Sequence, residues 1–291
     1  MRLSYSEYLT YIFLRIISRI IAFFPRKIML LIGKTFGWFV WKFIPIRKKV
    51  ALKNLSIAFP DKSDTEKNKI LKNTYIHFGM VLIDFLRLPF LTLQKLENIL
   101  TIEEDSIKLL KSTKNGIIVS GHIGNWEMFS PAFGLNNFPF LVVAQSQKNK
   151  GANKFFTWAR ESVGIRIIYK KDSTKKMLLG LKKGFLGLVS DQFAGKSGVV
   201  VNFFNRPTSI PKGAAIFYDK TGIPILSGFC ILSGDLKYHL SLREMKQSVS
   251  MKNTDDLISN VSQQISTDLE KIVTEYPEQY FWFHRKWRRK V

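Results

Sequence analysis

The sequence predicts an α/β fold, with a mixed sheet flanked by helices and a helical arm in front of it. From about residue 100, short β-rich runs alternate with helical stretches, an order typical of a sheet covered by helices on its faces. The expected strands are 116–120, 139–144, 165–169, 185–190, 199–204, 223–231 and 236–243. The expected helices of this region are 125–135, 147–163, 173–183, 211–220 and 254–275. In the last strand apolar and polar residues alternate, which indicates an edge or solvent-facing strand.

Two more helices are expected before the sheet, at 46–57 and 64–89. The turn between them contains Pro60, and Ser63 is a suitable cap for the second helix. No internal repeat, low-complexity tract or long linker interrupts the sequence. We therefore expect one large domain, 46–291, preceded by a hydrophobic or amphipathic arm, 1–45.

The arm is apolar but carries basic residues inside its hydrophobic runs. In segment 8–27, Arg15 and Arg19 interrupt the apolar region and no small-residue cleavage site follows, which excludes a signal peptide. In a membrane-spanning helix, two central arginines cost about 5 to 7 kcal/mol, whereas the apolar residues contribute about −3 to −6 kcal/mol. A narrow polar stripe at helical spacing favours a helix that lies in the headgroup plane. Segment 28–45 can lie there as well; a pair of core helices is the alternative.

The chain is strongly basic, with 45 Lys and Arg against 22 Asp and Glu and a net charge of +23. Such an excess indicates an anionic partner, either nucleic acid or an acidic membrane surface. The 24 Phe and 6 Trp, and the basic residues that adjoin apolar runs, favour the membrane surface. No zinc-finger or RNP-type spacing supports nucleic acid. Cys230 is the single cysteine, so no intrachain disulfide can form, which fits a cytoplasmic setting.

The segment GIIVSGHIGNWEMFSPAFG, residues 116–134, places a histidine and a carboxylate just beyond an expected strand. On one ideal helix, residues five apart point about 140° away from each other. His122 and Glu127 can therefore cooperate only if His122 lies in a turn and Glu127 in the first turn of the next helix, for which Asn125 is a suitable N-cap. Histidine beside a carboxylate is suited to taking a proton from a hydroxyl. A hydrogen-bonded histidine that caps a loop is the alternative.

This segment resembles the HX4D/E motif of membrane glycerolipid and lipid A acyltransferases, and most of all the bacterial lipid A biosynthesis lauroyl/myristoyl acyltransferase family. Three further blocks are similar to that family and occur in the family's order: KKVALKNLSIAFPDKS (48–63), VSDQFAGKSGVVVNFFNRPTSIPKGAA (189–215) and YPEQYFWFHRKWRRK (276–290). The resemblance covers nearly the whole chain. It implies a glycerolipid acyltransferase-like fold and transfer of a fatty acyl chain to a lipid A precursor at the cytoplasmic face of the cell inner membrane.

The resemblance also implies that His122 is the general base and that Glu127 orients its imidazole. The acceptor hydroxyl would attack the carbonyl of a thioester donor, acyl-ACP or acyl-CoA, and the resulting oxyanion needs N–H donors or a cation. Arg160 is a candidate for that cation, because its helix is similar to a family segment that carries an arginine. Pairing of Arg160 with Glu161 or with solvent is the alternative. Asn125 is a candidate for lining the mouth of the site.

Four more residues are candidates for substrate binding because of where they stand. Asp191 and Gln192 follow an apolar strand and are expected at its carboxyl edge, where ligand sites gather in α/β sheets. A structural ion pair is the alternative for Asp191. Arg206 and Thr208 precede a helix expected to begin near Pro211, and a helix N-terminus is suited to phosphate.

No metal site and no bound cofactor are expected, because no HExxH pattern and no Gly-rich phosphate loop is present. Two alternatives for the function stay open. In the first, the chemistry is the same but the acceptor is a lysophospholipid or an aminolipid. In the second, the chain is a basic protein that binds membranes or nucleic acid without catalysis, which explains the charge but not His122 and Glu127.

Overall fold

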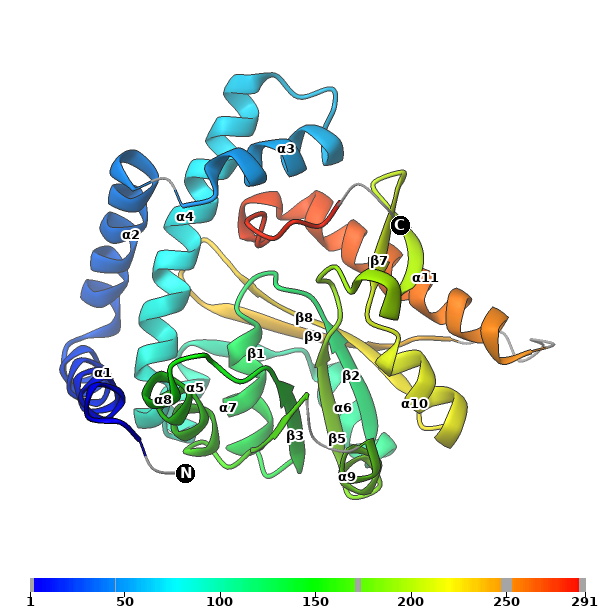
Figure 1. Cartoon of the computed structure of the whole chain (residues 1–291). Coiled ribbons are helices and arrows are strands. Elements are labelled where there is room, and N and C mark those ends of the chain that lie inside the picture. The colour runs from blue at the N-terminus through cyan, green and yellow to red at the C-terminus, as the bar shows by residue number, and fades with distance from the viewer. Residues whose placement is uncertain (1–2, 45, 171–173, 247–252, 288–291) are drawn as a thin grey trace.

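The computed structural model describes residues 3–44, 46–170, 174–246 and 253–287, and its centre is a seven-stranded sheet (Figure 1). The strand order is β1-β9-β8-β2-β5-β3-β4. Strand β9 is antiparallel to β8 and parallel to β1, and the pairings among β8, β2, β5, β3 and β4 are all parallel. The sheet is therefore mixed, as the sequence predicts. The strands are β1 (Leu100–Ile102), β2 (Gly116–Ser120), β3 (Phe140–Ala144), β4 (Arg166–Tyr169), β5 (Phe185–Val189), β8 (Ile225–Leu232) and β9 (Tyr238–Glu244).

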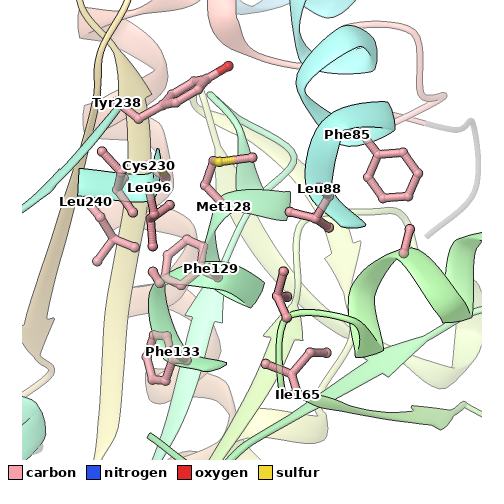
Figure 2. Close-up of a cluster of buried hydrophobic side chains, with 14 of the residues drawn as sticks. Phe85, Leu88, Leu96, Met128, Phe129, Phe133, Ile165, Cys230, Tyr238 and Leu240 are labelled. Atoms are coloured by element: carbon pink, nitrogen blue, oxygen red, sulfur yellow. The ribbon is translucent and has the colours of Figure 1, made fainter. Parts of the chain in front are cut away.

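Helices cover both faces of this sheet (Figure 1). Consecutive residues of a strand point to opposite faces, and in β2 this sends Ile117 and Ile118 into two different cores. Ile118 belongs to the core that also contains Met128, Phe129 and Phe133 (Figure 2). The helices that follow residue 45 are α3 (Lys48–Ala58), α4 (Asp64–Arg87), α5 (Leu93–Glu97), α6 (Glu104–Thr113), α7 (Phe129–Gly134), α8 (Lys150–Glu161), α9 (Thr174–Leu181), α10 (Gly213–Thr221) and α11 (Thr254–Glu275).

Beside the sheet, strands β6 (Val199–Phe203) and β7 (Arg206–Ile210) form a separate antiparallel hairpin. Its two turn residues, Phe204 and Asn205, both have positive φ angles, 51° and 53°, which matches the twist of a two-residue hairpin. A third apolar cluster joins this hairpin to α3 and to the C-terminal segment 276–287. In that cluster Leu55, Phe203 and Trp282 are fully or almost fully buried. The C-terminal segment is therefore part of the core.

The N-terminal helices α1 (Tyr5–Phe23) and α2 (Arg26–Phe43) pack against α4 (Figure 1). The contact between α2 and α4 is close because glycines face each other. A Cβ atom on Gly79 would lie 2.2 Å from the carbonyl oxygen of Gly33, so neither position can carry a larger side chain without moving a helix.

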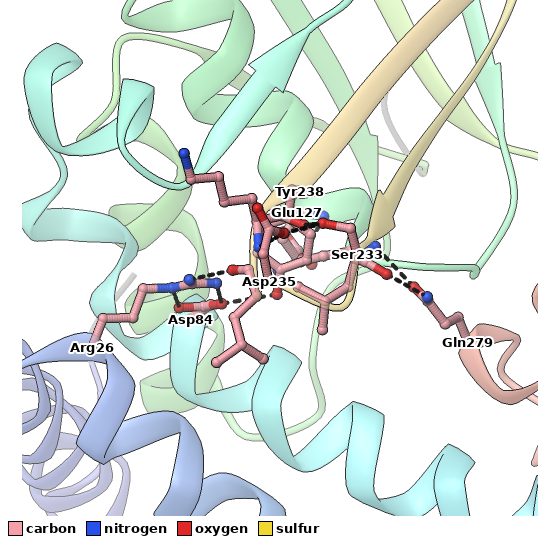
Figure 3. Close-up of polar contacts among 11 residues, drawn as sticks. Arg26, Asp84, Glu127, Ser233, Asp235, Tyr238 and Gln279 are labelled. Carbon is pink, nitrogen blue, oxygen red and sulfur yellow. Dashed lines mark hydrogen bonds and ion pairs between the residues drawn. The ribbon is translucent and has the colours of Figure 1, made fainter.

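A buried polar network ties the arm to the sheet (Figure 3). Arg26 at the start of α2 donates two hydrogen bonds to the carboxylate of Asp84 in α4, at 2.8 and 2.7 Å. Tyr238 at the start of β9 donates to the same carboxylate at 2.8 Å. Because Asp84 is 2% exposed, these donors replace the water that the charge loses on folding.

The outer faces of α1 and α2 remain apolar and exposed. Exposed large apolar side chains there include Phe13, Ile16, Ile20, Phe23, Leu31, Phe36, Phe39 and Phe43. Among the described residues, no single helix is long and apolar enough to cross a membrane. Helices α2 and α3 pass that test only as a pair, with a bend of 96° between them.

Each expected helix and strand has a counterpart in the structure, although β1, β7, α5 and α6 were not among the predictions. The expected helix 125–135 divides into a short 3-10 helix, η2 (Trp126–Met128), and α7. Strand β9 has a half-exposed face but is not at the edge, because β1 covers it. Residues 1–2, 45, 173 and 288–291, which belong to predicted segments, lie outside the described residues.

Candidate active site

The pairing of two parallel strands positions the site. Strands β2 and β5 are hydrogen-bonded neighbours with Ser120 opposite Val189. Their next residues emerge at the same edge of the sheet, and the pairing continues through a hydrogen bond from Ser190 N–H to the carbonyl of Ser120, at 2.9 Å. His122 and Asp191, each two residues beyond its strand, therefore lie side by side, although 69 positions separate them in the sequence.

The carboxylate of Asp191 holds both the side chain and the main chain of His122. Its Oδ1 lies 2.6 Å from His122 Nδ1, and its Oδ2 accepts the main-chain N–H of His122 at 3.1 Å. An ionised carboxylate only accepts hydrogen bonds, so Nδ1 carries the proton and Nε2 of the neutral ring is left as an acceptor. The side chain of Asp191 is 4% exposed and that of His122 is 21% exposed. The imidazole is thus anchored at Nδ1 and remains partly exposed.

Burial and neighbouring charges set the protonation of this pair. Burial alone lowers the pKa of His122, but the negative charges of Asp191 and Glu127 outweigh it and raise the pKa above the usual value. Burial alone raises the pKa of Asp191, but His122 and Lys286 outweigh it and hold that pKa well below the usual range. Asp191 is therefore ionised at neutral pH, and His122 is a stronger base than a free histidine.

The resemblance implies that Glu127 orients the imidazole of His122, but the carboxylate hydrogen-bonded to that ring is Asp191. Glu127 instead accepts two hydrogen bonds from Arg160, from Nε at 2.8 Å and from Nη2 at 2.7 Å. Both side chains are largely buried, 10% and 18% exposed, and two parallel bonds of this kind fix the guanidinium plane. Arg160 in α8 is therefore paired with Glu127. The alternative expectation, that Arg160 pairs with Glu161 or faces solvent, is wrong.

Asn125 has the structural position that its residue type predicts. It is fully buried and its Oδ1 accepts the main-chain N–H of Glu127 at 3.2 Å, which caps η2. Just before it, Gly124 has a φ of +58°, and a Cβ there would lie 2.0 Å from the carbonyl oxygen of Cys230. Only glycine fits this bend. His122 accordingly lies in the turn and Glu127 in the first turn that follows.

Aromatic rings and an amide surround the free edge of His122. The ring centroids of Trp126 and Phe281 lie 4.7 and 6.1 Å from that of His122. Gln192 Nε2 lies 3.4 Å from His122 Nε2, so the amide of Gln192 faces the nitrogen that would take a proton. A reacting group at this nitrogen would meet two aromatic rings and one amide donor.

The C-terminal segment supports the loop that carries His122. Phe281 N–H donates to the carbonyl of His122 at 2.8 Å, and Gly124 N–H donates to the carbonyl of Gln279 at 2.9 Å. Asn54 of α3 holds this segment from its other side, by hydrogen bonds to the carbonyls of Trp282 and His284 at 2.7 and 2.6 Å. The family-like blocks 48–63 and 276–290 are thus in contact. Block 116–134 supplies His122, and block 189–215 supplies Asp191.

Arg206 and Thr208 precede helix α10, as expected, but both belong to strand β7. The helix itself begins at Gly213, with Lys212 as its N-cap residue. Thr208 is fully buried, and its hydroxyl donates to the carbonyl of Lys286 at 2.7 Å. Pro207 is tolerated in this strand because it lies beside the hairpin turn.

One group that the sequence did not single out is Lys286, whose ammonium donates to the main-chain carbonyl of Asp191 at 2.7 Å. It lies within a run of basic residues, which is ordinarily a solvated surface, and nothing in the sequence alone marks it as buried. Among the described residues, no group of three or more His, Cys, Asp or Glu side chains could hold a metal ion.

Taken together, a neutral imidazole anchored by a buried carboxylate at Nδ1, with Nε2 unprotonated, can accept a proton from a hydroxyl. Comparison with known proteins places this arrangement in a family. The model of the bacterial lipid A biosynthesis acyltransferases matches residues 1–289. The chain belongs to this family. It is an acyltransferase, which excludes a protein that binds without catalysis.

Similar proteins of the family differ widely in sequence from this chain. The lipid A biosynthesis lauroyltransferase of Escherichia coli (strain K12) is 23% identical over 275 residues, which is 91% of this chain and 86% of that protein. The lipid A biosynthesis palmitoleoyltransferase of the same organism is 21% identical over 273 residues, with the same coverage. A phosphatidylinositol mannoside acyltransferase of Mycolicibacterium smegmatis (strain ATCC 700084 / mc(2)155) is 26% identical over 131 residues, 43% of each chain.

Proposed function

We propose that this acyltransferase moves a fatty acyl chain from an acyl thioester, acyl-ACP or acyl-CoA, to a hydroxyl of a lipid A precursor, with His122 as the general base. The observation that carries the proposal is the 2.6 Å contact between His122 Nδ1 and Asp191 Oδ1, because it fixes the tautomer that leaves Nε2 as a base. The relatives named as lipid A lauroyl- and palmitoleoyltransferases support the choice of acceptor.

In the proposed reaction, Nε2 of His122 takes the proton of the acceptor hydroxyl while its oxygen attacks the thioester carbonyl. The carbonyl π electrons move onto oxygen and form a tetrahedral oxyanion. When that oxyanion collapses, the C–S bond breaks and the thiolate takes the proton back from the imidazolium. The products are an ester and a thiol, and Asp191 stabilises the imidazolium throughout.

The oxyanion needs positively polarised groups near His122 Nε2. The amide of Gln192 is the described side-chain donor within 3.4 Å of that nitrogen, and we assign it to this role. We also assign to Arg160, whose guanidinium Glu127 holds in place, the role of the cation that stabilises the oxyanion. Glu127 also raises the basicity of His122 by its charge, which gives this carboxylate a part in the site without a direct hydrogen bond to the imidazole.

We further propose that residues 1–45 attach the acyltransferase domain, 46–291, to the anionic cytoplasmic face of the inner membrane. The exposed apolar faces of α1 and α2 support a position within the headgroup plane. Arg15 does not conflict with that position, because its guanidinium stacks 3.7 Å from the ring centroid of Trp158 in α8. A cation on an aromatic face is partly compensated for the loss of water.

The test is acyl transfer with purified full-length protein, read by mass spectrometry. The acceptors are a lipid A precursor and a lysophospholipid, each offered with acyl-ACP and with acyl-CoA of several chain lengths. One added acyl chain on the lipid A precursor is the expected product. Acylation of the lysophospholipid in its place would reassign the acceptor, and a mannosylated phosphoinositide would then be the next acceptor to test, since one set of relatives is named for it.

A further inference from the structure

Lys286 is a buried ammonium directly behind the candidate catalytic pair. The residue is 3% exposed. Its Nζ donates to the main-chain carbonyl of Asp191 at 2.7 Å and lies 4.0 Å from the ring centroid of Phe203. Its own carbonyl accepts the hydroxyl of Thr208. Hydrogen bonds thus fix both the ammonium and the main-chain carbonyl of Lys286.

A charge in this position costs free energy unless the fold uses it or compensates it. No carboxylate lies within 4.0 Å of Nζ among the described residues; Asp191 and Glu270 act on it only through their charges. Four serines, Ser120, Ser190, Ser227 and Ser266, line a small cavity together with Asp191 and Lys286. The ammonium thus lies beside a small cavity of mixed polar and apolar lining that it shares with Asp191.

We propose that Lys286 is a positioning residue of the acyl-transfer site: its ammonium holds the main chain of Asp191, and its charge opposes protonation of the His122 imidazole before the acceptor arrives. The inference rests on the proposed function, in which His122 is the base. A base that is already protonated cannot accept the hydroxyl proton, so a carboxylate as close as Asp191 needs an opposing charge behind it.

The other charges around His122 have defined directions. Asp191, beyond β5, and Glu127, in η2, raise the pKa of His122. Lys286 lowers it, and His284 on the same C-terminal segment repels a protonated His122 as well. Arg160 is bound to Glu127. Burial lowers the pKa of Lys286 itself, to about 8, so the ammonium is still charged at neutral pH.

The experiment measures the titration of His122 by NMR of histidine-labelled full-length protein, together with the pH dependence of kcat/KM. Lys286→Gln removes the charge but keeps an N–H donor, and Lys286→Met is the second neutral variant if the first does not fold. Lys286→Arg keeps the charge. Asn54→Ala is the matched structural control, since Asn54 is uncharged and holds the same segment through the carbonyls of Trp282 and His284.

The expected result is a rise in the pKa of His122 by about one pH unit in the neutral variants, as for a unit charge within about 10 Å at an effective dielectric constant of about 20. The acidic limb of kcat/KM moves by the same amount, and Lys286→Arg restores it. Asn54→Ala lowers Tm without moving the limb. An unmoved His122 titration in a folded neutral variant, or an equal movement in Asn54→Ala, would overturn the inference. Failure of the proposed function shows separately, as full acyl transfer by His122→Ala.

Discussion

Asp191, 69 residues further along the chain, binds His122 at two points. Its carboxylate contacts Nδ1 of the imidazole at 2.6 Å and accepts the main-chain N–H of His122. The carboxylate five positions away, Glu127, is bound by Arg160 instead. The two carboxylates therefore have different partners: Asp191 orients the imidazole, and Glu127 fixes the guanidinium of Arg160. Each can be removed without the other, and the two removals have different consequences.

Asp191→Asn tests the first pair. We expect kcat to fall by about 10²- to 10⁴-fold, because the amide neither selects the Nδ1–H tautomer nor stabilises the imidazolium. The remaining activity should have its acidic limb at lower pH than the wild type. The sign follows from the charge: Asp191 raises the pKa of His122, so its loss lowers that pKa and keeps the imidazole neutral to lower pH. A pH–rate profile measures both, and an unmoved limb would argue against the pairing.

The second pair is tested by a double-mutant cycle of Glu127→Gln and Arg160→Lys. Lysine cannot reproduce the two parallel N–H···O bonds of the guanidinium, so we expect each single variant to lose about tenfold or more in kcat/KM. The double variant should lose much less than the product of the two, because residues in one pair are not additive. Losses that simply multiply would mean that Glu127 and Arg160 act independently.

Arg26→Leu tests the network that attaches the arm to the sheet. It leaves the carboxylate of Asp84 buried with Tyr238 as its remaining side-chain donor, and breaking a buried ion pair in this way costs about 3 to 5 kcal/mol. Chemical unfolding followed by circular dichroism measures the loss. Lys27→Leu is the matched control, since Lys27 is the exposed neighbour, and its effect should stay within about 0.5 kcal/mol. Equal effects of the two variants would exclude a stabilising role for the network.

Membrane attachment through the arm is tested by flotation with anionic vesicles. Phe13, Ile20 and Leu31 are 61%, 52% and 64% exposed on α1 and α2, and their replacement by Glu should weaken binding by about tenfold or more per site, since each buried side chain contributes about 1.5 to 3 kcal/mol. Leu179→Glu changes an equally exposed apolar residue outside the arm, 52% exposed, and should float as the wild type does. If the arm variants float as the wild type does, residues 1–45 do not bind the membrane through these apolar side chains.

The parts of the fold that local pattern decides were predictable. The apolar run of β2, the bend at Gly124 and the capping of η2 by Asn125 each follow from a few adjacent residues, and the structure has all three. The expectation that Asp191 and Gln192 emerge at a sheet edge was also correct in position, because a strand with an apolar sequence ends just before them.

What the sequence did not reveal depends on pairing between distant segments. Strand β2 pairs with β5 rather than with the next strand in sequence, β3. This pairing brings His122 and Asp191 within hydrogen-bonding distance. Lys286 lies in a basic run, and only its tertiary contacts show that it is buried. Likewise, the stacking of Arg15 on Trp158 cannot be read from the sequence around Arg15. These outcomes depend on tertiary contacts that no local spacing encodes.

The central claim, that the imidazole of His122 removes the acceptor proton, is tested most directly by the rate of acyl transfer of His122→Ala, compared with the wild type at equal amounts of folded, vesicle-bound protein. Removing a general base should lower kcat by about 10²- to 10⁴-fold while leaving the circular dichroism spectrum and vesicle binding as they are. Transfer by this variant within a few-fold of the wild-type rate would contradict the account.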